Sequence, residues 1–287
     1  MRLKRRQMDF WGRPAILVTL VGSLCVLSSS VVVAEGTVDS RERPSNGVSN
    51  SDFGGKAESD PGVVAHWRFQ KGIAGSGTSS SQLIEDSSGN NHHGRAVGGP
   101  RFHSVELPST NLALAFDGHN DRIAVADARD FQLTKSLTIE AWIEVAFYPE
   151  SSSKLSHIAF RGDNRLGFDP WFLAITESGQ LRFLIANGLN KASVVLSPEP
   201  LPTRKLIHVA AVLDDEVGMQ SLFINGERVA TTKTKIRACG PLGGTGPGIG
   251  IGGRQAHSNQ GFRGSIGELR ISARALTEAQ FLPLESE

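Results

Sequence analysis

The sequence predicts an all-β protein, a sandwich of two antiparallel sheets. About a dozen short segments rich in β-branched, aliphatic or aromatic residues follow one another at short intervals, with no helices between them. The chain has 32 glycines, many at turn-like positions between these segments. Only residues 276–282 have a helical pattern, with Thr277 as the expected N-cap.

The strands can be assigned individually from their composition and from the turns between them. An Asn-Gly pair, Asn225-Gly226, separates two of them and predicts a tight hairpin, because both residues tolerate positive φ. The predicted strands are residues 63–69, 112–116, 122–126, 136–147, 156–161, 171–176, 181–186, 205–214, 220–224, 227–232, 248–253 and 262–272.

Residues 1–34 are expected to be a signal peptide or a membrane anchor. Several arginines and one lysine precede an uncharged stretch, residues 15–34, which ends in the small residues Val32 and Ala34. A cleaved secretory signal has this pattern, but twenty uncharged residues can also just span a bilayer. Either way the chain is expected to be secreted or extracytoplasmic, in the periplasm or cell envelope, with membrane contact only through residues 15–34 if they are retained.

Two further regions follow the N-terminal segment. Residues 35–61 are rich in Ser, Gly, Asn and charge, so we expect a disordered linker. Residues 62–282 contain all the predicted strands and form the expected folded domain.

Charge and cysteine content exclude several classes of protein. The 30 basic and 29 acidic side chains give a net charge of +1, which argues against a nucleic-acid partner. The two cysteines are too few for a disulfide framework or a cysteine-rich structural metal site.

Several stretches, in the right order, resemble the LamG-like jellyroll family of the concanavalin A-like lectin/glucanase superfamily. The resemblance covers about residues 62–282 and implies a jellyroll sandwich. The stretches are AHWRF (65–69), DSSGNNHHG (86–94), LALAFDGHNDRIAVAD (112–127), SLTIEAWI (136–143), LIHVAAVLDD (206–215), LFINGERVA (222–230), IGIGGR (249–254) and FRGSIGELRISARALTEAQ (262–280).

The loop that follows residues 112–116 is a candidate calcium site. Asp117, Asn120 and Asp121 offer side-chain oxygens close together, and Ca²⁺ prefers several oxygen ligands. Family members often bind Ca²⁺ where this loop meets the closing strand, which makes Glu268 the fourth expected ligand. Gly267 stands where the family pattern has Asp, so one carboxylate is missing. The same loop also fits an Asx-type turn without metal, and both interpretations are open.

Glycoside hydrolysis is the enzymatic alternative. It needs two carboxylates roughly 5 Å or 6.5–9.5 Å apart. Glu140 and Glu144 share one face of a predicted strand, but strand geometry separates them by about 13 Å. The sequence therefore predicts that the domain is not an enzyme.

Sugar-binding sites combine aromatic platforms with polar neighbours, and one loop–strand junction has that composition. The candidates are Trp171 and Phe168 with Arg165 and Asp169. Tyr148 beside Pro149 is a further candidate.

The sequence therefore predicts an exported, non-catalytic recognition or adhesion module, with Ca²⁺ as its candidate cofactor. Its expected partner is a carbohydrate or an extracellular or envelope protein, bound by loops at one rim of the sandwich. Two alternatives are open: a carbohydrate-active enzyme with an atypical site, and a structural accessory module of a cell-envelope complex.

Overall fold

The computed structural model describes residues 62–150, 155–162, 169–189, 191–243, 248–255 and 260–284. The predicted signal or anchor segment, residues 1–34, and the predicted linker, residues 35–61, lie outside these ranges. Within them, no helix has the length and apolar character needed to cross a bilayer.

The described residues form two eight-stranded sheets in which every pair of neighbouring strands is antiparallel. The first sheet comprises β1 (Val63–Trp67), β4 (Arg101–Ser104), β5 (Leu112–Asp117), β7 (Leu137–Val145), β12 (Leu206–Asp214), β13 (Met219–Ile224), β14 (Glu227–Lys233) and β16 (Arg263–Ser272). The second comprises β2 (Leu83–Ile84), β3 (Gly94–Val97), β6 (Arg122–Ala126), β8 (Ser156–Gly162), β9 (Trp171–Ile175), β10 (Gln180–Ala186), β11 (Ala192–Pro200) and β15 (Gly248–Ile251).

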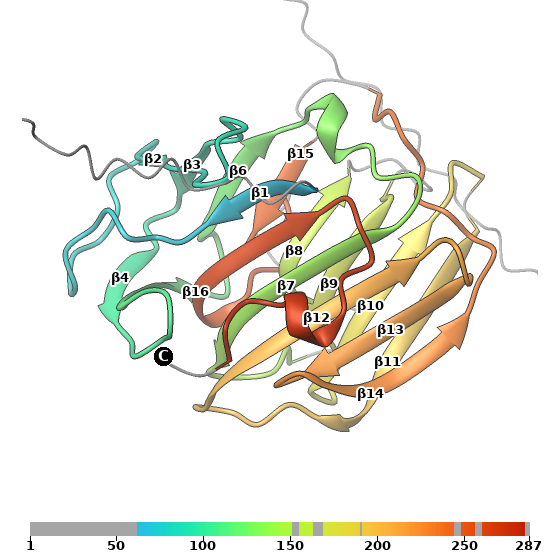
Figure 1. Cartoon of the computed structure of the whole chain (residues 1–287). Helices are drawn as coiled ribbons and strands as arrows, with labels where there is room; N and C mark the ends of the chain where they lie inside the picture. Colours follow the sequence, from blue (N-terminus) through green and yellow to red (C-terminus); the bar gives the residue numbers. More distant parts are fainter. Residues whose placement is uncertain are drawn as a thin grey trace, which may run out of the picture. The chain divides into compact units, whose positions relative to one another are not determined.

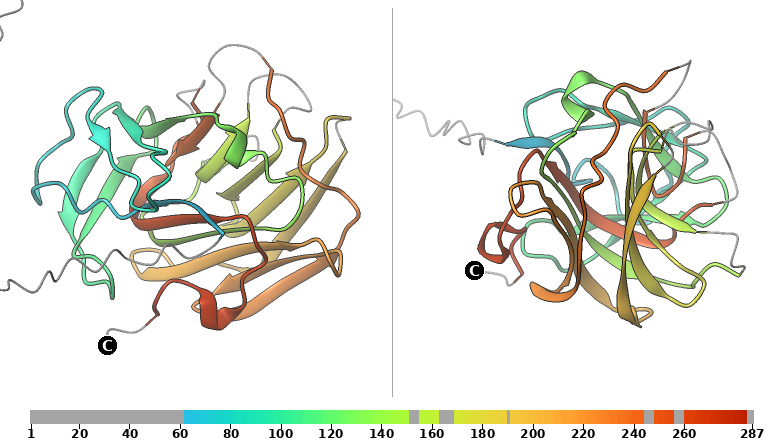
Figure 2. Two further views of the ribbon diagram at one scale, coloured as in Figure 1. Left: turned by 45° about the horizontal axis from the view of Figure 1, so that its top comes forward. Right: turned by 90° about the vertical axis from the view of Figure 1, so that its right-hand side faces the viewer.

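The order of strands shows how the sheets are assembled. The first sheet runs β14-β13-β12-β7-β16-β5-β4, with β1 also paired to β16, and the second runs β11-β10-β9-β8-β15-β6-β3-β2. The two sheets face each other as the layers of a sandwich (Figures 1 and 2). The predicted sandwich of antiparallel sheets is confirmed.

Most individual strand predictions are also confirmed. Asn225 and Gly226 join β13 to β14 with φ of 50° and 79°, as the hairpin signal requires. The helical turn is a single 3₁₀ turn, η2 (Glu278–Gln280), with Thr277 as its N-cap, and a second, η1 (Arg129–Phe131), precedes β7. Strands β2, β3, β4 and β11 were not predicted, because they are short or have exposed, polar and proline-containing sequences.

The core lies between the sheets, where side chains alternate inward along each strand. On β7, Ile139, Ala141 and Ile143 have no exposed surface, and on β10 Leu181 and Phe183 face them from the other layer. Each such Ile, Leu or Phe side chain contributes roughly 1.5–3 kcal/mol on burial.

The outer face of the first sheet is covered by the C-terminal segment, which is seen in red in front of β7 and β12 (Figure 1). Leu276 and Phe281 pack there on Phe223. Beneath them Glu140 is fully buried. Its carboxylate accepts hydrogen bonds from Arg270 Nε (2.7 Å) and from the Leu282 amide (2.7 Å), and lies 3.0 Å from His208 Nε2.

The outer face of the second sheet carries a buried imidazole. His157 on β8 contacts the rings of Phe160 and Phe172 edge-on, with each pair of ring centroids 5.2 Å apart. Burial lowers the pKa of His157 to about 3, and the charges of Arg254 and Arg182 act in the same direction. The imidazole is therefore neutral in the folded state across most of the acidic range.

This buried imidazole predicts a pH dependence of stability. Between pH 3 and pH 6.5 the unfolded chain binds a proton at His157 that the folded chain does not, so stability falls as the pH falls. We expect this residue to contribute a loss of about 1.4 kcal/mol per pH unit over that window.

Urea unfolding between pH 7 and pH 4 tests this expectation. The free energy of unfolding should fall less steeply with falling pH in His157→Gln than in wild type. His119→Gln, a change at an exposed histidine, is the control and should keep the wild-type slope. Equal slopes in His157→Gln and wild type would contradict the assignment.

Candidate ligand site at the rim of the sandwich

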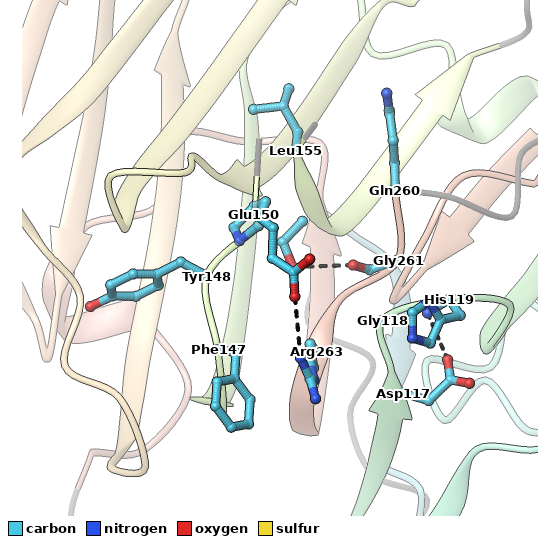
Figure 3. Close-up of a pocket in the computed structure, with 12 residues that line it drawn as sticks. Asp117, Gly118, His119, Phe147, Tyr148, Glu150, Leu155, Gln260, Gly261 and Arg263 are labelled. Carbon is cyan, nitrogen blue, oxygen red and sulfur yellow. Dashed lines mark hydrogen bonds and ion pairs between the residues drawn. The ribbon is translucent and has the colours of Figure 1, made fainter. Parts of the chain in front are cut away.

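A pocket of about 130 Å³ lies at one rim, where four chain segments meet. They are the loop after β5, the segment after β7, the start of β8 and the residues that lead into β16 (Figure 3). Strand register explains the meeting, because β16 pairs with both β5 and β7, which places Arg263 opposite Asp117 and Gly264 opposite Val145. We call this the rim pocket; its lining residues are Asp117, Gly118, His119, Phe147, Tyr148, Pro149, Glu150, Leu155, Ser156, Gln260, Gly261 and Arg263.

An exposed aromatic ring with charged neighbours forms one side of the rim pocket. Phe147 is 46% exposed, which is unusual for a large apolar side chain. The Arg263 guanidinium lies 4.2 Å from its ring centroid and that of Arg204 lies 5.7 Å from it. Glu150 makes an ion pair with Arg263 at 4.0 Å (Figure 3). The rim pocket therefore offers partly exposed aromatic surface together with donors and acceptors of hydrogen bonds.

The loop 117–121 on the opposite side is an Asx-type turn. Asp117 Oδ1 accepts hydrogen bonds from the backbone amides of His119 (2.7 Å), Asn120 (3.2 Å) and Asp121 (3.4 Å). Gly118 supplies the positive φ, 82°, that the loop needs. The loop therefore forms the predicted turn, whose hydrogen bonds hold it beside the rim pocket.

Asp121 has little capacity left for a ligand. It is buried, and its two carboxylate oxygens accept from the Gly99 amide (2.7 Å) and the Asp117 amide (3.0 Å). Burial raises the pKa of Asp121; these backbone hydrogen bonds oppose the rise, while repulsion from the Asp117 carboxylate adds to it.

Glu268 belongs to a different cluster. It is fully buried, with His66 Nε2 at 2.5 Å, Arg68 Nε at 3.5 Å and a hydrogen bond from Ser109. Burial works to raise the pKa of Glu268, but these partners outweigh it and the pKa is lowered. On β16, Arg263 pairs with Asp117 and Ile266 pairs with Leu114, and Glu268 lies further along the strand. Glu268 is therefore separated from the level of Asp117 by roughly 15 Å of strand.

The four predicted calcium ligands are therefore not brought together. Asp117, Asn120 and Asp121 share the loop, but Glu268 does not reach it, and most carboxylate oxygens in the loop are already used by backbone amides. Among the described residues, no group of three or more His, Cys, Asp or Glu side chains is placed to hold a metal ion. The residues present do not fit the predicted four-ligand site.

Gly267 has a packing role that the sequence alone does not reveal. A Cβ at this position would overlap Leu107 Cδ1, from the loop that lies over β16. The absence of a side chain at 267 therefore lets this loop close over β16 and lets Ser109 reach Glu268.

The prediction that Trp171 is an exposed sugar platform is wrong. Trp171 has no exposed surface and belongs to the core, because strand alternation points it inward with Leu173 and Ile175. Asp169 lies next to β9 and is 3.8 Å from Arg254. The other two predicted residues, Arg165 and Phe168, lie outside the described residues.

Tyr148 does line the rim pocket, but its side chain is also anchored. Its hydroxyl donates to the carbonyl of Leu201, and its ring fills the space beside Gly179. The residues that sequence reasoning missed are Phe147, Glu150 and Arg263. Phe147 ends a predicted strand and could have been suspected from its position before Tyr148-Pro149, whereas Arg263 approaches it only through strand pairing.

The carboxylates considered for glycoside hydrolysis are not available as a pair. Glu140 is sealed beneath the C-terminal segment and bonded to Arg270, His208 and the Leu282 amide. In the rim pocket, Asp117 anchors a turn and Glu150 is exposed and paired with Arg263.

Comparison with known proteins agrees with this architecture. Residues 117–281, more than half of the chain, match the family model of the concanavalin A-like lectin/glucanases superfamily. The chain belongs to this superfamily, of the laminin G type. No curated protein sequence matches it.

Solved structures with the same fold include clostridial toxin binding domains. The binding domain of Paraclostridial Mosquitocidal Protein 1 is 17% identical, with a TM-score of 0.57, and the match covers 76% of this chain and 50% of that one. The binding domain of Botulinum neurotoxin DC in complex with rat synaptotagmin II is 17% identical, with a TM-score of 0.53 and coverage of 76% and 49%. The same domain in complex with SialylT is 16% identical, with a TM-score of 0.52 and coverage of 76% and 50%. The chain thus spans about half the length of the chains it matches, and at this identity the likeness concerns the fold alone.

The packing role of Gly267 gives a stability prediction. Gly267→Ala should lower the free energy of unfolding by up to about 1 kcal/mol, because the new methyl group overlaps the end of the half-buried Leu107 side chain, which must move aside. Gly99→Ala is the matched control, since a Cβ there meets nothing within 4 Å. Urea unfolding of both variants measures the difference. Adding Leu107→Ala to Gly267→Ala should remove most of the overpacking component; the same loss at both glycines would contradict the assigned role.

Proposed function

We propose that this protein is an exported, non-catalytic recognition module that binds a carbohydrate at the rim pocket. The observation that carries the proposal is the exposed ring of Phe147, flanked by Arg263 and Glu150 in a hollow at the edge of a rigid sandwich. A sugar presents an apolar ring face and several hydroxyls, and such a ligand matches an aromatic face rimmed by charged donors and acceptors.

The related structures support a binding role. The Botulinum neurotoxin DC domain is described in complex with SialylT and with rat synaptotagmin II, so one domain of this fold has both a glycan and a protein ligand. A non-catalytic role is supported by the burial of Glu140 and by the ion pair of Glu150 in the rim pocket.

Export is proposed from the N-terminal sequence alone. The basic residues before the uncharged stretch 15–34 have the pattern of a secretory signal or anchor, and the polar stretch 35–61 would act as a tether. In this arrangement the sandwich presents its rim pocket outside the cytoplasm, to a glycan or to an envelope or extracellular protein.

The ring of Phe147 gives the sharpest test of glycan binding. We expect the full chain to bind glycans on an array, and Phe147→Ala to weaken the strongest of these interactions at least tenfold by titration calorimetry, because the ring face is lost. Arg263→Ala should weaken it to a smaller degree. Arg228→Ala is the matched control: it also removes an arginine near an aromatic ring, Phe223 at 5.9 Å, but on β14, away from the rim pocket.

Other outcomes would separate the alternatives. A blank array for a folded chain would contradict glycan binding and leave the protein-ligand and structural-accessory roles. Hydrolysis of a bound glycan would overturn the non-catalytic assignment. Equal binding by Phe147→Ala and wild type would show that the ligand does not bind at the rim pocket.

Calcium dependence remains a prediction, and it now concerns the loop 117–121 without Glu268. A Ca²⁺ ion there would rely on the second carboxylate oxygen of Asp117 and on backbone carbonyls. Such binding would raise Tm with millimolar Ca²⁺ and would be lost in Asp117→Asn, which keeps an oxygen to accept the turn amides. A wild-type Tm that does not change with Ca²⁺ would contradict the calcium prediction. Mg²⁺ is the control ion.

A further inference from the structure

The outer face of the second sheet carries a cluster of aromatic and basic side chains, which adjoins the rim pocket at Leu155 and Gln260. His157 and Phe160 lie on β8, Phe172 on β9 and Arg182 on β10, and these strands are neighbours in the sheet (Figure 1). Arg254 approaches the same rings from the residues that follow β15. We call these five residues the arginine face.

The aromatic rings support the two guanidinium groups. The rings of Phe160 and Phe172 are stacked with their centroids 6.3 Å apart, and both are nearly fully buried. The Arg254 guanidinium lies 4.5 Å from the Phe160 centroid, and that of Arg182 lies 5.7 Å from the Phe172 centroid. Two cations thus lie over adjacent rings, which attract them through the cation–π interaction.

The two arginines differ in how they are neutralised. Arg254 has the Asp169 carboxylate at 3.8 Å and the Gln260 side-chain oxygen at 3.4 Å. The Arg182 guanidinium makes no hydrogen bond or ion pair with any described residue, and its Nε atom is buried. Burial also lowers the pKa of Arg182, as expected for a cation partly removed from water.

An arginine in this state has unused binding capacity. A guanidinium carries five donors in a planar fork. The buried Nε–H of Arg182 has no acceptor, and leaving a buried donor unpaired costs free energy. His157 adds no competing charge, because burial lowers its pKa to about 3. The rings beneath are too buried to act as an open stacking platform, so a ligand would be recognised through its own charge.

We infer that the arginine face is a second binding site, which takes the carboxylate of an acidic saccharide on the fork of Arg182. A planar carboxylate can accept two parallel hydrogen bonds from the guanidinium. Leu196 of β11 lies opposite Arg182 in the sheet and is 41% exposed, so it offers apolar surface to the sugar ring next to its carboxylate. The choice of a saccharide rests on the proposed function, whereas the choice of an anionic group rests on the unpartnered Arg182 guanidinium.

The experiment compares acidic with neutral sugars on the full chain. Sialyllactose and trigalacturonate are the acidic probes, and lactose and maltotriose are their neutral counterparts, all titrated by calorimetry at low salt. We expect at least one acidic probe to bind at least tenfold more tightly than its neutral counterpart. Arg182→Gln should remove that advantage, because it removes both the charge and the fork. Arg182→Lys, which keeps the charge but not the fork, should recover only part of it.

Two control variants locate the effect. Arg228→Gln removes a comparable arginine on the other sheet and should leave acidic binding unchanged. Phe147→Ala damages the rim pocket and should also leave acidic binding unchanged. The effects of the two sites can therefore be told apart. Thermal melting should give all four variants a Tm close to that of wild type, since each changes a side chain with exposed surface.

Three results would overturn the inference: acidic probes that bind no better than neutral ones, an Arg182→Gln variant that binds them like wild type, or acidic binding lost in Phe147→Ala but kept in Arg182→Gln. The last result would support the rim pocket as the site of acidic glycans. Loss in Arg182→Gln alone would support the arginine face and would say nothing against neutral glycans at the rim pocket.

Discussion

The position of β16 in the middle of the first sheet is the constraint on which the rest of the structure depends. This last strand of the chain pairs with β7 on one side and with β5 and β1 on the other. All three contacts join segments far apart in sequence, so their loop-closure entropy must be offset by burial between the sheets. The register of this one strand places Arg263 beside the loop 117–121 and Glu268 far from it.

The outer faces of the sheets use charge in two ways. On the first sheet, Glu140 is buried but fully partnered by Arg270, His208 and the C-terminal backbone, which satisfies the requirement for burying a charge. On the second sheet, Arg182 is half-buried over an aromatic ring without an acceptor among the described residues. The first arrangement holds the C-terminal segment in place, and the second leaves a donor group for a ligand.

The rim pocket and the arginine face also differ in what they can recognise. Phe147 is half-exposed with a guanidinium over its ring, so the rim pocket suits the apolar side of a sugar together with its hydroxyls. The rings of the arginine face are covered, so only the guanidinium edges are available there. A module with both features could bind one glycan that has neutral and acidic units, or two separate ligands.

The sequence by itself determined the fold class, most strands, the Asn225-Gly226 hairpin and the superfamily, because alternation and turn chemistry are local properties of the chain. It also placed the loop at Asp117 and drew attention to Tyr148. Only the tertiary structure decided that Trp171 faces the core, that Glu268 pairs with His66 and that Arg263 lies over Phe147. These outcomes depend on which strands become neighbours and in which register, and that is fixed by packing between distant segments rather than by any short stretch of residues.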